Sequence, residues 1–202
     1  EPTLAFLLEE VGFRFMSTIV IYGLEIKKSR KISCVIPNEI IIRELNKNDI
    51  PFLLNLAETA FVEDELNLSR FYVDQNIPKE KVAKIYKEWL LNCVSGVTAD
   101  KIFIAVNKNI PIGFITCKIL NPKYVDLTIG DIPLNAVAKQ FRGKGIYKAL
   151  VAKALKWFKI KKCDYVEIKT QLTTLAPQYV WQKYDGRLLN AEYHFHKWFK
   201  KT

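Results

Sequence analysis

The chain has few of the residues that build disulfide frameworks and metal centres. Its four cysteines, at positions 34, 93, 117 and 163, form no close pair, and it has two histidines. Because zinc sites and disulfide frameworks need such residues at short spacings, buried and reduced thiols fit this pattern better. Reduced thiols are typical of cytoplasmic proteins, so a cytoplasmic location is expected. The sequence also lacks a recognisable signal peptide and any apolar run as long as a membrane span.

Acidic residues are the minority, with 21 Asp and Glu against 31 Lys and Arg, which gives a net charge of +10. Such a surface attracts anions, and the candidates are nucleic acid, membrane headgroups and phosphorylated small molecules. The lysines are spread along predicted helix faces and chain ends, without one basic block interleaved with aromatic residues. That distribution argues against nucleic acid, so we expect an anionic small molecule as partner.

Residues 134–147 carry the most specific pattern in the chain. An apolar, strand-like run leads into a short loop with Gly143 and Gly145, and the loop opens directly into an amphipathic helix. The first turn of a helix has free backbone N–H groups at the positive end of its dipole, and glycine lets a phosphate come close. Basic side chains surround the loop at Arg142, Lys144 and Lys148. The pattern predicts a pyrophosphate site, although glycine turns also open helices for purely structural reasons.

The spacing Gln140-x-x-Gly143-x-Gly145 resembles the acetyl-CoA loop of the GNAT N-acetyltransferase family. It lacks the longer glycine spacing of a Rossmann fingerprint and the Gly-Lys-Ser/Thr ending of a P-loop. The resemblance implies acetyl-CoA as co-substrate, with its pyrophosphate on the amides of residues 142–147. It also implies that residues 135–137 pair with the pantetheine arm, where a bulge offers an N–H to the thioester carbonyl. The coenzyme-binding residues implied are Asn135, Ala136, Val137, Arg142, Gly143, Lys144, Gly145, Ile146, Tyr147, Thr174 and Trp181.

Hydrophobic periodicity predicts alternating strands and helices over most of the chain. From residue 39 onward the prediction begins with a strand at 39–45, helices at about 48–60 and 79–94, and strands at 101–107, at 112–120 and up to 138. It continues with a helix at 145–160, a strand at 164–170, a helix at 175–184 and a strand at 188–199. Asn48-Asp49 is expected to cap the first of these helices. This order is that of the GNAT fold. The resemblance implies an α/β (α+β) fold with a mixed, mostly antiparallel sheet, helices on both faces, and a splayed central strand pair that admits the thioester arm.

An additional unit precedes this core. The sequence predicts a helix over 4–11, a stop at Gly12 and a strand near 13–26, followed by a charged linker. We expect residues 1–36 to be the remnant of an N-terminal segment or small domain that packs on a GNAT domain of residues 37–202. Because the first residue is Glu1, we also expect the chain to begin partway into a longer protein.

Several local sequences resemble one branch of the family, the acetyltransferases that act on the amino group of TDP-fucosamine. They are Ser69-Arg70-Phe71, Ile85-Tyr86-x-x-Trp89-Leu90-x-Asn92, Thr170-Gln171 and Tyr193-His194, and that branch also carries an extra N-terminal segment. The resemblance implies a nucleotide-linked amino sugar as acceptor. A peptide or another small amine as acceptor stays open, as do a catalytically impaired acyl-CoA-binding protein and a homodimer.

The group that protonates the departing thiolate is where the sequence departs from the family. Many members carry a tyrosine for this step on the short helix, but the ungapped match places Trp181 there and Thr174 at an asparagine position. An indole N–H donates a hydrogen bond but is not a usable acid. Tyr184 lies one turn along on the same side, so we predict it as the acid, whereas Tyr179 points away. A packing role for Tyr184, and a thiolate that takes its proton from water, are the alternatives.

No general base stands out from the sequence. Asp126, Asp131 and Glu167 lie on predicted strands near the splay, but each also fits an ordinary surface carboxylate, and a sugar amine can lose its proton to water. His194 and His196 share one face of the last predicted strand. No third ligand at a suitable spacing accompanies them, so we expect no metal site.

Overall fold

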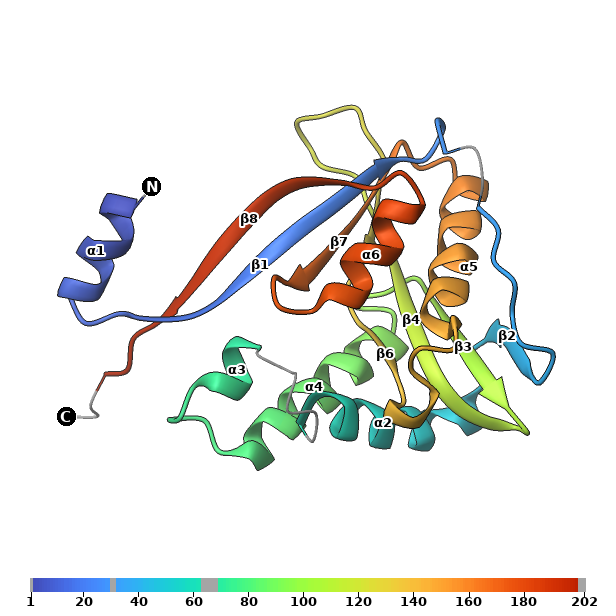
Figure 1. Ribbon diagram of the computed structural model, residues 1–202, viewed down its shortest axis with the longest axis horizontal. Coiled ribbons are helices and arrows are strands. Elements are labelled where there is room, and N and C mark those ends of the chain that lie inside the picture. The colour runs from blue at the N-terminus through green and yellow to red at the C-terminus, as the bar shows by residue number, and fades with distance from the viewer. Residues whose placement is uncertain (1, 30–31, 63–68, 200–202) are drawn as a thin grey trace.

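The computed structural model describes residues 2–29, 32–62 and 69–199, in which helices cover both faces of one open sheet (Figure 1). The strands are β1 (Arg14–Glu25), β2 (Ile40–Glu44), β3 (Lys101–Asn107), β4 (Ile110–Leu120), β5 (Ile129–Ile132), β6 (Asn135–Val137), β7 (Tyr165–Gln171) and β8 (Arg187–His196). The α-helices are α1 (Pro2–Glu10), α2 (Ile50–Val62), α3 (Arg70–Val73), α4 (Lys79–Val94), α5 (Ile146–Ile160) and α6 (Leu175–Lys183). In this part of the chain, no helix is long and apolar enough to cross a membrane.

The sheet has the strand order β2-β3-β4-β5-β7-β1-β8, and β6 continues the line of β5 along β4. Only the β5–β7 pair is parallel among the described strand pairs. The sheet is therefore mixed and mostly antiparallel, as predicted.

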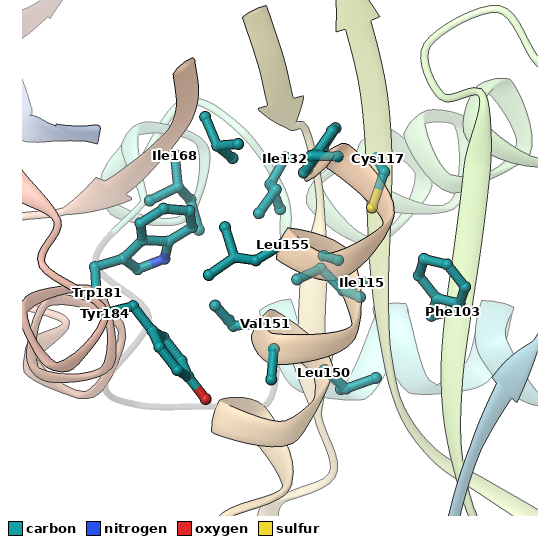
Figure 2. Packing of buried hydrophobic residues seen from close by; sticks show 14 of the residues in the cluster. Phe103, Ile115, Cys117, Ile132, Leu150, Val151, Leu155, Ile168, Trp181 and Tyr184 are labelled. Carbon is teal, nitrogen blue, oxygen red and sulfur yellow. The ribbon is translucent and has the colours of Figure 1, made fainter. Parts of the chain in front are cut away.

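Two apolar cores lie on opposite faces of this sheet. One contains the buried faces of α5 and α6 with Val151, Leu155 and Ile168 among its members (Figure 2). The other contains the buried faces of α2 and α4 with Leu53 and Leu90. Helices on both faces are what the family resemblance implied, and each helix carries an apolar stripe that the sheet buries.

The start of α2 differs from the prediction. A short 3₁₀ turn over Lys47–Asp49 precedes the helix, with Asn46 as its N-cap, and Asp49 of the predicted Asn48-Asp49 pair closes a capping box with Asn46. Asp49 turns back to accept the backbone N–H of Asn46 at 2.7 Å and the guanidinium of Arg43 at 2.7 and 2.9 Å. The arginine on the preceding strand thus binds the carboxylate that the sequence suggested as part of the cap.

β5 and β6 are one strand interrupted at Pro133 and Leu134. The hydroxyl of Thr116 on β4 donates to the carbonyl of Leu134 and accepts its N–H, both at 2.9 Å, which fills the gap in the ladder. Pairing with β7 ends at Ile132 opposite Ile168, and beyond that point β6 pairs with β4. The two central strands therefore separate after Ile132, and this confirms the predicted splay.

β1 lies inside the sheet, although it precedes the predicted GNAT core. It pairs with β7 from Ile19–Gln171 to Glu25–Tyr165, and with β8 along its other edge (Figure 1). The boundary after residue 36 stays a prediction about domain organisation. The strand of that first segment, β1, nevertheless lies between β7 and β8 in the sheet formed by residues 37–202.

Candidate active site

The loop between β6 and α5 is open toward solvent. Gly143 and Gly145 have φ angles of +76° and +78°, and among the described residues no atom lies within 4 Å of the place where a Cβ would stand on either glycine. The first backbone bond of α5 runs from Ala149 N–H to the carbonyl of Gly145 at 3.0 Å. The amides at the start of α5 therefore have no partner within the helix, and an anion can approach them.

The basic residues of the loop differ in role. Arg142 donates its Nε–H to the carbonyl of Val137 at 3.1 Å, so part of its side chain fixes the loop to β6. The ammonium of Lys144 lies 5.2 Å from the ring centroid of Phe141, on an exposed part of the loop. Lys148 lies one turn into α5, with its ammonium 5.9 Å from the ring centroid of Tyr184. These side chains keep positive charge beside the amides.

β6 presents an open edge to the splay. Asn135, Ala136 and Val137 pair with Ile115, Phe114 and Gly113 of β4. Among the described strands, β6 has no partner on its other side, so N–H and C=O groups on that edge are available to an extended ligand. The geometry fits the pantetheine arm that the sequence resemblance places there.

Trp181 and Tyr147 bring two buried polar atoms into the site. Trp181 is fully buried and points from α6 toward α5 (Figure 2). Within the described part of the chain, neither Trp181 Nε1 nor Tyr147 Oη has a hydrogen-bond partner. Burial raises the pKa of Tyr147 well above its ordinary value, and the nearby indole of Trp181 offsets only part of this effect. An unpaired buried donor costs about 1–3 kcal/mol, which a ligand that accepts the bond would recover.

Tyr184 is also buried, but its hydroxyl is engaged. The Oη atom lies 3.2 Å from the backbone carbonyls of both Ser33 and Lys148, and its one proton is shared between them. Burial raises the pKa of Tyr184 well above its ordinary value, which weakens it as an acid. The structure thus gives Tyr184 a specific packing role, in which it joins α6 to the linker and to α5. Its role as the acid stays a prediction.

The remaining α6 residues lie at the rim. Thr174 is half-buried at the start of the helix, with its N–H bonded to Gln171 at 3.0 Å and its carbonyl accepting from Gln178 at 3.2 Å. Tyr179 is largely exposed, in line with the prediction that it points away. Gln178 and Gln182 both contact the hydroxyl of Tyr22, so α6 is fixed to β1 as well.

The three candidate bases have different surroundings. Asp126 lies in an exposed loop between β4 and β5, so its expected place on a strand is wrong. Asp131 stands on β5 directly beside Glu167 of β7. Burial raises the pKa of Asp131 to about 6, with a further contribution from the charge of Glu167. Because its neighbours Gly130 and Ile132 face α5, Asp131 points to the opposite face of the sheet.

His196 is bonded to a buried carboxylate from a distant segment. His196 Nδ1 lies 2.7 Å from Asp74 Oδ2, and Trp198 Nε1 donates to the same oxygen at 2.9 Å. Burial opposes the ionisation of Asp74, but the bonds from His196, Asn76 and Trp198 outweigh it and hold its pKa below the ordinary value. In the described ranges, no group of three or more His, Cys, Asp or Glu side chains is placed to hold a metal ion.

Asp74 is a residue that sequence reasoning missed. Its oxygen accepts the backbone N–H of Asn76 at 2.9 Å, which makes an Asx turn before α4. An Asp two residues before an Asn ahead of a helix is a recognisable turn signal, but its contact with β8 joins positions more than 120 apart. That second contact has no local sequence signal.

Comparisons with known proteins agree with this geometry. A sequence model described as "Acetyltransferase (GNAT) family" matches residues 59–185, more than half of the chain. No curated protein matches the sequence at a significant level. Among solved structures, the chain is similar to a conserved protein of unknown function from Staphylococcus epidermidis, at 15% identity and a TM-score of 0.63. It is also similar to a GCN5-related N-acetyltransferase from Sphaerobacter thermophilus, at 16% identity and a TM-score of 0.61.

The lengths of these relatives differ from that of the chain. The chain is covered to 96% and 97% in the two comparisons, but it spans only 66% and 56% of those two proteins. A third similar structure, the NatC complex bound to Gag peptide and CoA, has 24% identity and a TM-score of 0.51 over 72% of this chain and 82% of that one. At such identities the similarity establishes the fold. Taken with the family match over residues 59–185, it shows that the chain belongs to the GNAT family, whose members are N-acetyltransferase enzymes.

Proposed function

We propose that the chain transfers the acetyl group of acetyl-CoA to the amine of a nucleotide-linked amino sugar. The observation that carries the coenzyme half of this proposal is the open glycine loop, which leads into α5 beside the splay of β6 and β7. The amides of residues 142–147 would hold the pyrophosphate, and a relative of this fold has been solved with CoA bound. We also propose a cytoplasmic location, where acetyl-CoA is available and the four unpaired cysteines stay reduced.

The edge of β6 would hold the thioester for attack. Asn135, Ala136 and Val137 offer backbone groups to the pantetheine arm, and one N–H aimed at the carbonyl oxygen is worth about 3 kcal/mol of barrier. The indole N–H of Trp181, which lacks a partner in the described chain, would orient the sulfur. Holding both reactants in register contributes about 7–11 kcal/mol in well-oriented cases.

Asp131 is the base that the structure favours among the candidates. Its carboxylate would accept the proton of the incoming amine, the amine nitrogen would bond to the carbonyl carbon, and the carbon–sulfur bond would break. A pKa of about 6 leaves Asp131 mostly ionised at neutral pH and close to the range in which proton transfer is efficient. It lies on the face of the sheet away from α5, so the acceptor and the coenzyme would approach the splay from opposite sides.

The thiolate has two routes to a proton. Tyr184 is the acid that we predict from the sequence, and its hydroxyl would have to release the carbonyls of Ser33 and Lys148 to act. The competing route is protonation by water after the thiolate leaves. The full burial of Trp181 at the tyrosine position also supports the second candidate function, a catalytically impaired acyl-CoA-binding protein.

Release of free thiol separates these functions. The protein is incubated with acetyl-CoA and TDP-fucosamine, with a peptide amine, or with a simple polyamine, and free CoA is detected with a thiol reagent. Release that depends on the sugar nucleotide supports our proposal, whereas release with another amine alone assigns a different acceptor. Coenzyme binding without release from any amine would establish the binding protein.

A further inference from the structure

α1 and β1, at the start of the chain, repeat the geometry of α6 and β8, at its end. Both helices have nine residues. Each is followed by a residue with a positive φ angle, +89° at Gly12 and +66° at Asp185, and a strand begins two residues later. The offset that takes Gly12 to Asp185 also takes both ends of α1 to the ends of α6, and the first residue of β1 to that of β8.

The backbone bonds that end the two helices correspond at the same offset. Each helix is closed by one bond from an N–H to the carbonyl three residues before it and one bond to the carbonyl five residues before. The four bonds run from Gly12 to Glu9 at 3.0 Å, from Phe13 to Leu8 at 2.9 Å, from Asp185 to Gln182 at 3.1 Å and from Gly186 to Trp181 at 2.9 Å. This pair of bonds is a Schellman motif, which ends many helices. Here the helix length and the start of the strand match as well, so the two units are equivalent in structure.

α6 buries one of its faces in this chain. Trp181 and Tyr184 are buried and point toward α5, and Val180 packs against the same core (Figure 2). Tyr179 lies on the other side of the helix and is 67% exposed. The inward face of α6 is therefore covered by α5 and the sheet, and its outward face meets solvent.

The corresponding face of α1 is apolar but exposed. The counterparts of Val180, Trp181 and Tyr184 are Leu7, Leu8 and Val11, and Leu4 precedes them on the same face of the helix. In the described part of the chain, Leu4, Leu7 and Val11 are 58%, 52% and 56% exposed. Figure 1 shows α1 beyond the end of the sheet, away from α5 and α6. This helix thus carries the stripe that α6 buries, but the sheet of this chain does not cover it.

β1, in contrast, is fully incorporated into the sheet of this chain. β7 and β8 are successive strands joined by α6, yet β1 lies between them and pairs with both. Its residues Val20, Tyr22 and Leu24 are at most 5% exposed. Successive strands are usually neighbours in a sheet, so β1 takes the place beside β7 that β8 would otherwise occupy. The strand of the first unit is held by this sheet, whereas its helix has no sheet to cover it.

The lengths of two similar structures indicate further chain beside this fold. The Staphylococcus epidermidis and Sphaerobacter thermophilus proteins match 96% and 97% of this chain, so the matched region extends into β1. The match covers only 66% and 56% of those proteins. Proteins of this fold therefore carry additional chain together with a strand equivalent to β1.

We propose that Leu4, Leu7, Leu8 and Val11 form a docking face for a second acetyltransferase-like unit of the same polypeptide. The face reproduces, residue by residue, the face of α6 that packs on α5 and the sheet. α6 and β8 are the last elements of their unit, so α1 and β1 would be the last elements of a unit encoded ahead of Glu1. α1 would lie on that unit's sheet, and β1 would cross from it into the sheet described here. The docking face is independent of which amine the chain acetylates.

Hydrogen exchange of α1 is compared in the 202-residue chain and in the longer protein that the gene encodes. We expect the amides of α1 to exchange at least about a hundredfold more slowly in the longer protein, because docking covers the helix. The amides of β4 are the internal reference and should exchange at the same rate in both. Equal exchange of α1 in the two proteins, or a gene with no coding sequence ahead of Glu1, would overturn the proposal.

Leu7→Asp and Phe6→Asp are a matched pair of variants. Both side chains are apolar and exposed, at 52% and 64%, but the counterpart of Leu7 is Val180 in the core and that of Phe6 is the exposed Tyr179. In the longer protein, Leu7→Asp should remove the protection of α1, and Phe6→Asp should leave it. In the 202-residue chain, neither variant should change Tm or CoA affinity. Equal loss of protection in both variants would refute the assignment of the face.

A second copy of the chain is the competing occupant. Sedimentation of the 202-residue chain and of its Leu7→Asp variant separates the two occupants. We expect the substitution to leave the sedimentation coefficient unchanged. A dimer that Leu7→Asp dissociates and Phe6→Asp does not would assign the face to a second copy and overturn the proposal.

Discussion

The glycine loop and the face of the sheet away from α5 are built in different ways. In our proposal the loop uses main-chain amides of consecutive residues that follow Arg142, and no described atom lies within 4 Å of where a Cβ would stand on Gly143 or Gly145. The face of the sheet away from α5, called the acceptor face below, uses the side chains of Asp131 on β5 and Glu167 on β7, which come together only in the folded sheet. The comparison shows that a local main-chain site depends on backbone conformation, whereas the assembled site depends on strand order.

The largest effect is expected at the loop. Gly145→Glu would put a side chain on a residue with φ of +78° and a carboxylate at an anion site, so acetyl-CoA binding should fall below detection by calorimetry. Gly96→Glu is the matched control, since Gly96 has φ of +85° after α4, away from the loop. Unchanged affinity in Gly145→Glu, or equal losses in both variants, would contradict the role of the loop.

On the acceptor face, Asp131→Asn should lower kcat/KM by about 10²–10⁴-fold because it removes the base, while acetyl-CoA affinity stays the same. The wild-type rate should rise with pH through about 6, where the carboxyl of Asp131 ionises, and then level off. The pH–rate profile with saturating acetyl-CoA measures this.

Glu167→Gln also tests Asp131 as the base. The charge of Glu167 raises the pKa of Asp131, so its removal should move the inflection of the profile to lower pH with little loss of plateau rate. A profile that does not move, or a full rate in Asp131→Asn, would remove Asp131 from the mechanism.

Tyr184→Phe distinguishes the acid from the packing residue. Loss of the hydroxyl that bonds the carbonyls of Ser33 and Lys148 should lower the free energy of unfolding by about 1 kcal/mol. If our assignment is correct, turnover measured at temperatures below the thermal transition also falls at least tenfold, and acetyl-CoA affinity is retained. Turnover that holds, while Tyr179→Phe is inactive, would show that the acid has been misassigned.

The last prediction concerns stability, with no expected change in catalysis. Asp74→Asn should lower the free energy of unfolding by about 2 kcal/mol, because the buried carboxylate accepts from His196, Trp198 and Asn76. Since its pKa lies below the ordinary 3.8, this contribution is present above about pH 4 and is lost as pH falls through the lowered value. Urea unfolding at several pH values measures it, and a difference from wild type that persists in strong acid would contradict it.

The same contrast explains what the sequence could predict. α4 lies over Lys79–Val94 as its apolar periodicity predicts, and the loop was recognisable because its residues are consecutive. The place of β1 between β7 and β8 could not be read from its residues, since strand pairing depends on contacts far apart in the chain.

Site details were missed for the same reason. The raised pKa of Asp131 comes from burial and from Glu167, 36 positions away, and the hydroxyl of Tyr184 contacts a linker residue 151 positions away. The contact of Arg70 with His194 spans 124 positions. Residue type and local spacing contain no information about such neighbours, so the sequence could not show how these side chains are engaged.

The most direct measurement is an amide NMR titration of the protein with CoA. The account predicts that the largest shifts occur at the amides of Gly143, Gly145 and Tyr147. Pantetheine, which lacks the pyrophosphate, should not produce them. CoA binding that leaves these amides unmoved would contradict the central claim.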